Sequence, residues 1–166
     1  MKCLSMERKD EKMNVEIRSA LETDYDAVMN IMSQVQDMHV QWRPDIYKYN
    51  DQLFTREIFE TVIKGDTFFV AEINDFIVGV LEITFRHIES PAHVTRDVIF
   101  IDTMAIDEAY RGKGIGHQMF EFLKVVKTEK NKDGIELQVN ARNVVAYEMY
   151  KKCGFTEKSI NMELLD

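Results

Sequence analysis

The stretch Arg111-Gly112-Lys113-Gly114-Ile115-Gly116 carries three of the seven glycines of this chain within five positions. It follows an apolar segment at 98–106 and opens a segment at 114–130 whose apolar residues recur at helical spacing. Glycines let main-chain N–H groups approach a ligand closely, and the N-terminus of a helix favours anions. Arg111 and Lys113 add positive charge. The pattern therefore predicts a strand, a turn able to hold a diphosphate, and a helix.

Two familiar phosphate-binding motifs do not fit this turn. A P-loop needs Ser or Thr after its Gly-Lys pair, whereas Lys113 is followed by Gly114. A dinucleotide fingerprint starting at Gly112 would need glycine at its sixth position, where this chain has His117. A glycine-rich turn that binds no ligand stays open as an alternative.

Charge and length restrict the class of protein. The 166 residues correspond to one domain, with 21 Lys and Arg against 29 Asp and Glu, a net charge of −8. Nucleic acids and anionic membranes both need a basic surface, so neither is expected as a partner. No apolar run is long enough to span a bilayer.

The N-terminal residues indicate how the chain is divided into domains, and the cysteines indicate its cellular compartment. Residues 1–12 lack the apolar core of a secretory signal and are predicted to be a flexible leader, followed by a single domain at 13–166. Cys3 and Cys153 make neither a disulfide framework nor a metal-ligand cluster. A reducing, cytoplasmic location and the absence of a metal are the simplest expectations.

The remaining patterns predict a mixed α/β fold with one central sheet of about six strands flanked by about four helices. Strands are predicted at 14–18, 67–73, 76–85, 98–106, 135–139 and within 155–165. Helices are predicted from Thr23, near 51–64, over 114–130 and after Asn143, with loops at 41–49 and 86–96. The unit at 98–139 should be a right-handed parallel βαβ unit, with ligands beyond the ends of its strands.

The glycine-rich turn resembles the acetyl-coenzyme A signature of the GNAT superfamily of N-acetyltransferases. That signature reads Arg or Gln, any two residues, Gly, any residue, then Gly or Ala, and Arg111, Gly114 and Gly116 fill it. A later element of the same family is matched at Asn143, Ala146, Tyr150, Gly154 and Phe155. The two motifs occur in the expected order, and the predicted order of elements also agrees with the family.

The resemblance implies a site for acetyl-coenzyme A as the acyl donor, with no metal. Strand 98–106 would splay from strand 135–139, and the main chain of Met104, Ala105 and Ile106 would pair with the pantetheine amides. A main-chain N–H near Met104 or Ala105 would polarise the thioester carbonyl. The diphosphate would be held by Arg111, Gly112, Lys113, Gly114, Ile115 and Gly116. Asn143 and Tyr150 would line the pantetheine and thioester end.

The catalytic candidates are Tyr150, Asp102 and Glu82. Tyr150 stands where the family places its general acid, with a packed core tyrosine as the alternative. Asp102 interrupts an apolar strand and, by alternation, should share a face with Phe100 and Met104, so it is the candidate base. Glu82 on the neighbouring strand is its rival. A solvated carboxylate without a catalytic role is the alternative for both.

The acceptor side is expected in the predicted loop at 41–49. Trp42 could form a pocket wall, or anchor the loop by packing. Arg43 or Asp45 could select the charge of the substrate.

The resulting prediction is an N-acetyltransferase that moves an acetyl group to a primary amine of a small molecule by direct attack in a ternary complex. A protein or peptide N-terminal acetyltransferase and a non-catalytic coenzyme A-binding sensor are the alternatives. A homodimer, formed through an exposed sheet edge or the C-terminal strand, is compatible with the sequence.

Overall fold

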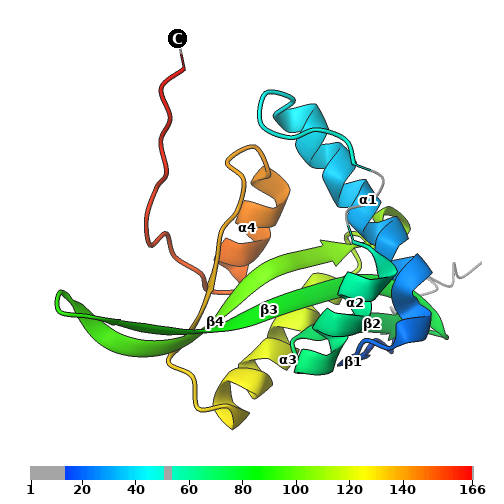
Figure 1. Cartoon of the computed structure of the whole chain (residues 1–166), viewed down its shortest axis with the longest axis horizontal. Helices are drawn as coiled ribbons and strands as arrows, with labels where there is room; N and C mark the ends of the chain where they lie inside the picture. The colour runs from blue at the N-terminus through cyan, green and yellow to red at the C-terminus, as the bar shows by residue number, and fades with distance from the viewer. Residues whose placement is uncertain (1–13, 51–53, 166) are drawn as a thin grey trace, which may run out of the picture.

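The computed structural model of the chain describes residues 14–50 and 54–165 (Figure 1). The predicted leader at 1–12 lies outside these residues. The main elements are β1 (Glu16–Ser19), α1 (Tyr25–Trp42), α2 (Arg56–Val62), β2 (Phe68–Ile73), β3 (Phe76–Ser90), β4 (His93–Ile106), α3 (Ile115–Glu129), β5 (Gly134–Leu137) and α4 (Val144–Lys152). Among the described residues, no helix combines the length and the apolar character needed to cross a membrane.

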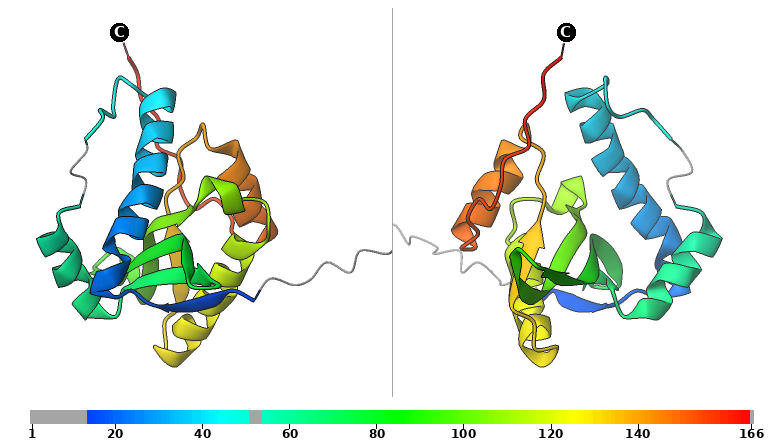
Figure 2. Two further views of the ribbon diagram at one scale, coloured as in Figure 1. Left: turned by 90° about the vertical axis from the view of Figure 1, so that its right-hand side faces the viewer. Right: turned by 60° about the vertical axis from the view of Figure 1, so that its left-hand side comes forward.

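The predicted mixed α/β fold is confirmed, with five described strands in the order β1-β2-β3-β4-β5. The first four strands are antiparallel, and β5 is parallel to β4, so β4, α3 and β5 form the predicted βαβ unit. Helices α1 and α2 cover one face of the sheet, and α3 covers the other (Figure 2). Each face has its own apolar core. The first includes Val28, Ile31, Phe59 and Val80, and the second includes Ile83, Ile99, Met119 and Leu123.

The segment at 86–96 is not the predicted polar loop. Strand β3 continues to Ser90 and β4 begins at His93, so the two strands form a long hairpin arm that projects from the sheet (Figure 1). Most residues of the arm are exposed. Exposed strands need no apolar face, so the polar residues at 86–96 did not indicate strands. Cross-strand contacts such as the one between His87 Nδ1 and Asp97 Oδ1, 3.0 Å apart, hold the arm together.

The predicted last strand within 155–165 does not form. This tail is extended and runs past α4, and its apolar side chains Ile160, Met162 and Leu164 are exposed. Lys158 pairs with Glu136 of β5 at 2.6 Å, and Glu163 pairs with Arg43 at the end of α1. The tail is therefore held by the packing of Phe155 and by side-chain ion pairs, and not by a main-chain ladder.

Two helices begin or end differently from the prediction. Helix α1 begins after Asp24, not Thr23, because Glu22–Asp24 first form a short 3-10 turn, in which the Asp24 carboxylate accepts a hydrogen bond of 2.8 Å from the N–H of Leu21. It also continues through Gln41 and Trp42, which the sequence pattern assigned to a loop. Helix α2 begins at Arg56, and the predicted earlier start at Asp51 lies outside the described residues.

Candidate functional site

The loop at 111–116 is an open turn that leads into a 15-residue helix. Gly112 and Gly114 have φ values of +74° and +81°, in the left-handed region that favours glycine. A Cβ atom at either residue would meet no other atom within 4 Å, so both glycines border free space. The first N–H groups of α3 have no partner within the helix and are directed toward this loop. This geometry fits a bound diphosphate.

Gly116 serves a different purpose from the other two glycines. A Cβ atom there would lie 2.9 Å from Sδ of Met149 in α4 and 3.5 Å from Cε of Met104 in β4. The missing side chain therefore allows α3, α4 and β4 to approach one another. Gly116 shapes the site through packing.

The cationic side chains of the loop bind neighbouring protein groups. Arg111 donates from Nε to the carbonyl of Ile106 at 3.0 Å, and its Nη2 lies 3.4 Å from Oε1 of Gln34 in α1. Lys113 donates to the carbonyl of Ala109 at 2.9 Å. Sequence reasoning missed Gln34, because a single polar residue on an amphipathic helix gives no indication of its partner.

Strands β4 and β5 separate beside this loop, as the family resemblance implied. Their pairing runs from Val98 with Gly134 to Ile101 with Leu137. Beyond Ile101, β4 continues to Ile106 paired with β3 alone. Within the described parts of the chain, the main chain of 102–106 therefore has no strand partner on the β5 side. Met104, Ala105 and Ile106 lie in this stretch, where an extended ligand could add main-chain hydrogen bonds.

Helix α4 brings Asn143 and Tyr150 to this region. The Asn143 side chain caps the helix, with Oδ1 accepting from the N–H of Ala146 at 3.1 Å. The Tyr150 ring packs against Phe120 and Phe155, with ring centroids 5.5 and 5.9 Å away. Burial raises the pKa of the Tyr150 hydroxyl, and the nearby Cys153 raises it further. The hydroxyl therefore keeps its proton at neutral pH.

A β-bulge corrects the expected orientation of Asp102. Glu82 of β3 faces Thr103, but the next residue, Ile83, faces Ile101, so Asp102 is an extra residue in β4. The Asp102 carboxylate accepts a hydrogen bond of 2.6 Å from Thr84, on the sheet face that α1 covers. Met104 packs into the core on the α3 face. Asp102 and Met104 therefore do not share a face, because the bulge breaks the alternation between them.

The two candidate bases lie on the same face in different environments. Glu82 is partly buried and accepts a hydrogen bond of 3.2 Å from Thr103. Burial raises the pKa of Glu82, the Thr103 bond opposes this shift, and the charge of Asp102 adds to it. Asp102 is exposed and lies 3.4 Å from Arg86 in addition to its bond from Thr84. Of the two, Glu82 has the environment of a proton acceptor.

The predicted acceptor residues lie at the C-terminal end of α1. Trp42 is partly buried, and its ring centroid is 5.7 Å from that of His39. Arg43 forms ion pairs with Asp45 at 2.6 Å and with Glu163 of the C-terminal tail. These contacts lower the pKa values of both carboxyl groups. Arg43 and Asp45 thus largely neutralise each other.

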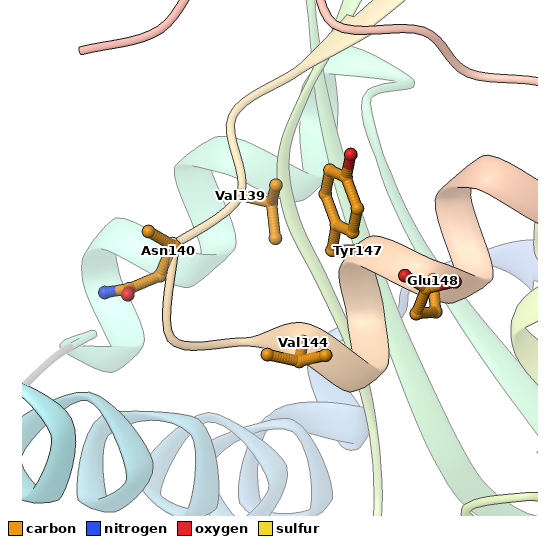
Figure 3. Close-up of a pocket in the computed structure, with 6 residues that line it drawn as sticks. Val139, Asn140, Val144, Tyr147 and Glu148 are labelled. Carbon is orange, nitrogen blue, oxygen red and sulfur yellow. The ribbon is translucent and has the colours of Figure 1, made fainter.

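A cavity of about 370 Å³ lies between the loop after β5 and helix α4 (Figure 3). Its lining consists of Val139, Asn140, Ala141, Val144, Tyr147 and Glu148. Figure 3 shows Val139 of the loop and Tyr147 of α4 facing each other. None of these residues is conspicuous in the sequence, since a cavity between a loop and a helix depends on their tertiary arrangement.

The comparisons with known sequences agree on one protein family. The profile of the acetyltransferase (GNAT) family matches residues 33–155. Streptothricin acetyltransferase of Escherichia coli is 35% identical over 66 residues, which are 40% of this chain and 38% of that protein. An N-alpha-acetyltransferase of Sulfolobus acidocaldarius is 26% identical over 151 residues, covering 88% of this chain and 82% of that protein.

Solved structures share the fold over nearly the full chain. A mutant of the BH1408 protein of Bacillus halodurans has a TM-score of 0.82 and 28% identity, covering 90% of this chain and 98% of its own. The aminoglycoside N-acetyltransferase AAC(6')-Iy, solved in complex with CoA, has a TM-score of 0.70 and 15% identity, covering 95% and 97%. At this identity the second likeness concerns the fold alone.

Proposed function

The chain belongs to the acetyltransferase (GNAT) family, and on that basis we propose that it transfers an acetyl group from acetyl-coenzyme A to a primary amine of a small molecule. When bound, acetyl-coenzyme A supplies the acetyl group as an activated thioester. The main chain of 104–106 would align its pantetheine arm, and the loop at 111–116 would hold its diphosphate. The open glycines and the unpaired stretch of β4 support this placement.

Proton transfer would fall to Glu82 and Tyr150. A primary alkylamine has a pKa near about 10.4 and is mostly protonated at neutral pH, so it must lose a proton before it attacks. Glu82 would accept this proton, directly or through a water molecule, aided by its raised pKa. The Tyr150 hydroxyl, which burial keeps protonated, would donate a proton to the departing thiolate. The amine would attack the thioester directly, within a ternary complex.

The acceptor would enter from the α1 face, where Glu82 lies. Trp42 would form part of the wall at the end of α1. Arg43 and Asp45 neutralise each other's charge. They would therefore line the entrance to the acceptor site and contribute little to selecting the charge of the substrate. A small amine is supported by the similarity to streptothricin acetyltransferase, although the match spans 38% of that relative.

The separation of β4 from β5 is the observation that carries the proposal. The experiment is to measure thiol release from acetyl-coenzyme A with a panel of polyamines, aminoglycosides, amino acids and streptothricin. We expect amine-dependent release with at least one small acceptor, and a reaction without amine serves as the background. If coenzyme A binds but no small amine stimulates release, the proposed transfer to a small amine is wrong, and the same result with short peptides would favour a sensor.

A second candidate, the acetylation of peptide N-termini, has one specific observation in its favour. The similarity to the N-alpha-acetyltransferase of Sulfolobus acidocaldarius extends over 88% of the chain. Short peptides with free N-termini therefore belong in the same panel. A kcat/KM for peptides well above that for every small amine would favour this function.

A further inference from the structure

We propose that Gln34 of α1 is a positioning residue that holds the diphosphate loop in its binding conformation. The inference rests on the proposed function, because the loop matters only if it binds coenzyme A. Figure 2 shows α1 running beside the segment that joins β4 to α3. Gln34 lies on this side of α1 and connects the helix to that segment through its carboxamide.

Both ends of the Gln34 carboxamide are used. Oε1 accepts a hydrogen bond of 2.9 Å from the N–H of Glu108, and Nε2 donates one of 3.1 Å to Oδ2 of Asp107. The other oxygen of Asp107 accepts from the N–H of Ala109 at 2.9 Å and caps the short turn Glu108–Tyr110. Gln34 therefore fixes the first residues of the turn that leads directly into Arg111.

The same side chain also reaches Arg111. Oε1 of Gln34 lies 3.4 Å from Nη2 of Arg111, while Nη1 of this arginine lies 3.6 Å from Sδ of Met38, one turn further along α1. Arg111 is exposed, and while its Nε stays bonded to the carbonyl of Ile106 at 3.0 Å, its two Nη groups have only these long contacts and can bind a diphosphate at little cost. Gln34 thus fixes the turn at Glu108–Tyr110 and also contacts the Arg111 guanidinium.

At neutral pH the amide satisfies this arrangement, whereas alanine and ionised glutamate do not. Alanine would leave the N–H of Glu108 without its acceptor and Asp107 without one of its donors. Glutamate would still accept from Glu108 and Arg111, but its charge would repel Asp107. A protonated glutamate, in contrast, has the shape of glutamine and can donate to Asp107 again. The glutamate variant should therefore regain function as the pH falls.

The experiment measures coenzyme A binding by calorimetry for the wild type, Gln34→Ala and Gln34→Glu. We expect Gln34→Ala to raise the Kd about tenfold, as the loss of about one net hydrogen bond predicts. Steady-state kinetics should show a raised KM for acetyl-coenzyme A and a nearly unchanged kcat. Asn30→Ala, which removes an exposed carboxamide one turn earlier on the same helix, is the matched control and should bind as the wild type does.

The pH dependence separates positioning from a general loss of structure. The ratio of the Gln34→Glu Kd to the wild-type Kd should shrink as the pH falls from about 8 to about 5, toward the range where glutamate takes up a proton. The ratio for Gln34→Ala should stay constant. If the wild type binds coenzyme A and Gln34→Ala binds equally well, the inference is wrong while the proposed function stands. If the wild type does not bind, the proposed function itself fails.

Discussion

The hydroxyl of Thr103 in β4 donates a hydrogen bond of 3.2 Å to Oε2 of Glu82, the residue that faces it in β3. The pair lies directly before the β-bulge at Asp102, on the sheet face that α1 covers. The bond orients the carboxylate, and burial makes it a stronger proton acceptor. Predictions about catalysis by this protein therefore begin with Glu82.

We expect Glu82→Gln to lower kcat about 100-fold, the usual contribution of a general base. In the wild type, kcat/KM should rise with pH as Glu82 loses its proton, with a midpoint above the ordinary value of about 4.3. This acidic limb should disappear in Glu82→Gln and persist in Asp102→Asn. A pH–rate profile of the three proteins checks this, and a limb lost only in Asp102→Asn would reverse the assignment.

Glu82→Gln should lower kcat without lowering the free energy of unfolding. Because the pKa of Glu82 is raised on folding, the folded state binds more protons than the unfolded state between the two pKa values. The wild-type free energy of unfolding should therefore fall as the pH rises through this window, and the loss persists at neutral pH. Glu82→Gln removes this contribution, so at neutral pH it should be at least as stable as the wild type. Urea unfolding across the window measures it, and a clearly less stable variant would contradict the argument.

Tyr150→Phe should lower kcat at least tenfold and leave the KM for acetyl-coenzyme A within about twofold, because only the proton donor is lost. The ring contacts with Phe120 and Phe155 are kept, so the unfolding midpoint should change little. Tyr147→Phe is the matched control. Its hydroxyl donates to Glu157 of the tail, and its loss should leave kcat unchanged. Equal kcat values for the two variants would remove Tyr150 from the mechanism.

A comparison of Gly114→Ala with Gly116→Ala should separate the effect of backbone strain from the effect of side-chain packing. Alanine at 114 must adopt a φ near +81°, which costs about 1–2 kcal/mol and favours a different turn. At 116 the new methyl group would lie 2.9 Å from Sδ of Met149, a flexible side-chain end that can move away, and in ordinary contact with Cε of Met104. We expect Gly114→Ala to be the less stable variant and to bind coenzyme A more weakly. Thermal unfolding and calorimetry test both, and equal values would contradict this assignment.

Trp42→Ala should raise the KM of the preferred acceptor several-fold while leaving the KM for acetyl-coenzyme A unchanged. The ring is only partly buried at the end of α1, so its loss should cost less than the 3–5 kcal/mol typical of a core tryptophan. Initial-rate kinetics with each substrate varied in turn are the measurement. A large loss of stability with an unchanged acceptor KM would make Trp42 a packing residue.

Local sequence patterns were sufficient to predict the glycine-rich turn at 111–116 and the helices α3 and α4. The predicted range 114–130 agrees with α3 at Ile115–Glu129, since helical spacing and a glycine cap are both properties of neighbouring residues. The Asn143 cap of α4 follows the same logic. The separation of β4 from β5 could be predicted only through the family resemblance, because nothing in either strand alone ends the pairing at Ile101.

The errors arose where contacts between distant residues decide the structure. Alternation placed Asp102 beside Met104, but the bulge opposite Glu82 and Ile83 depends on the register of two strands. The polar arm at 86–96 forms strands because each half pairs with the other, whatever its hydropathy. Gln34 could not be identified, because its partners lie more than 70 positions away.

An unpaired strand edge is normally an aggregation hazard, because it offers free main-chain groups to any other sheet. Among the residues that the structure describes, β4 has such an edge on its β5 side beyond Ile101. Met149 and Tyr150 of α4 pack against the same core as Met104, so α4 stands beside the opening. A second sheet that paired with this edge would have to fit beside α4, whereas a thin, flexible ligand needs less room. The fold thus leaves this edge available to a narrow ligand, with a helix standing beside it.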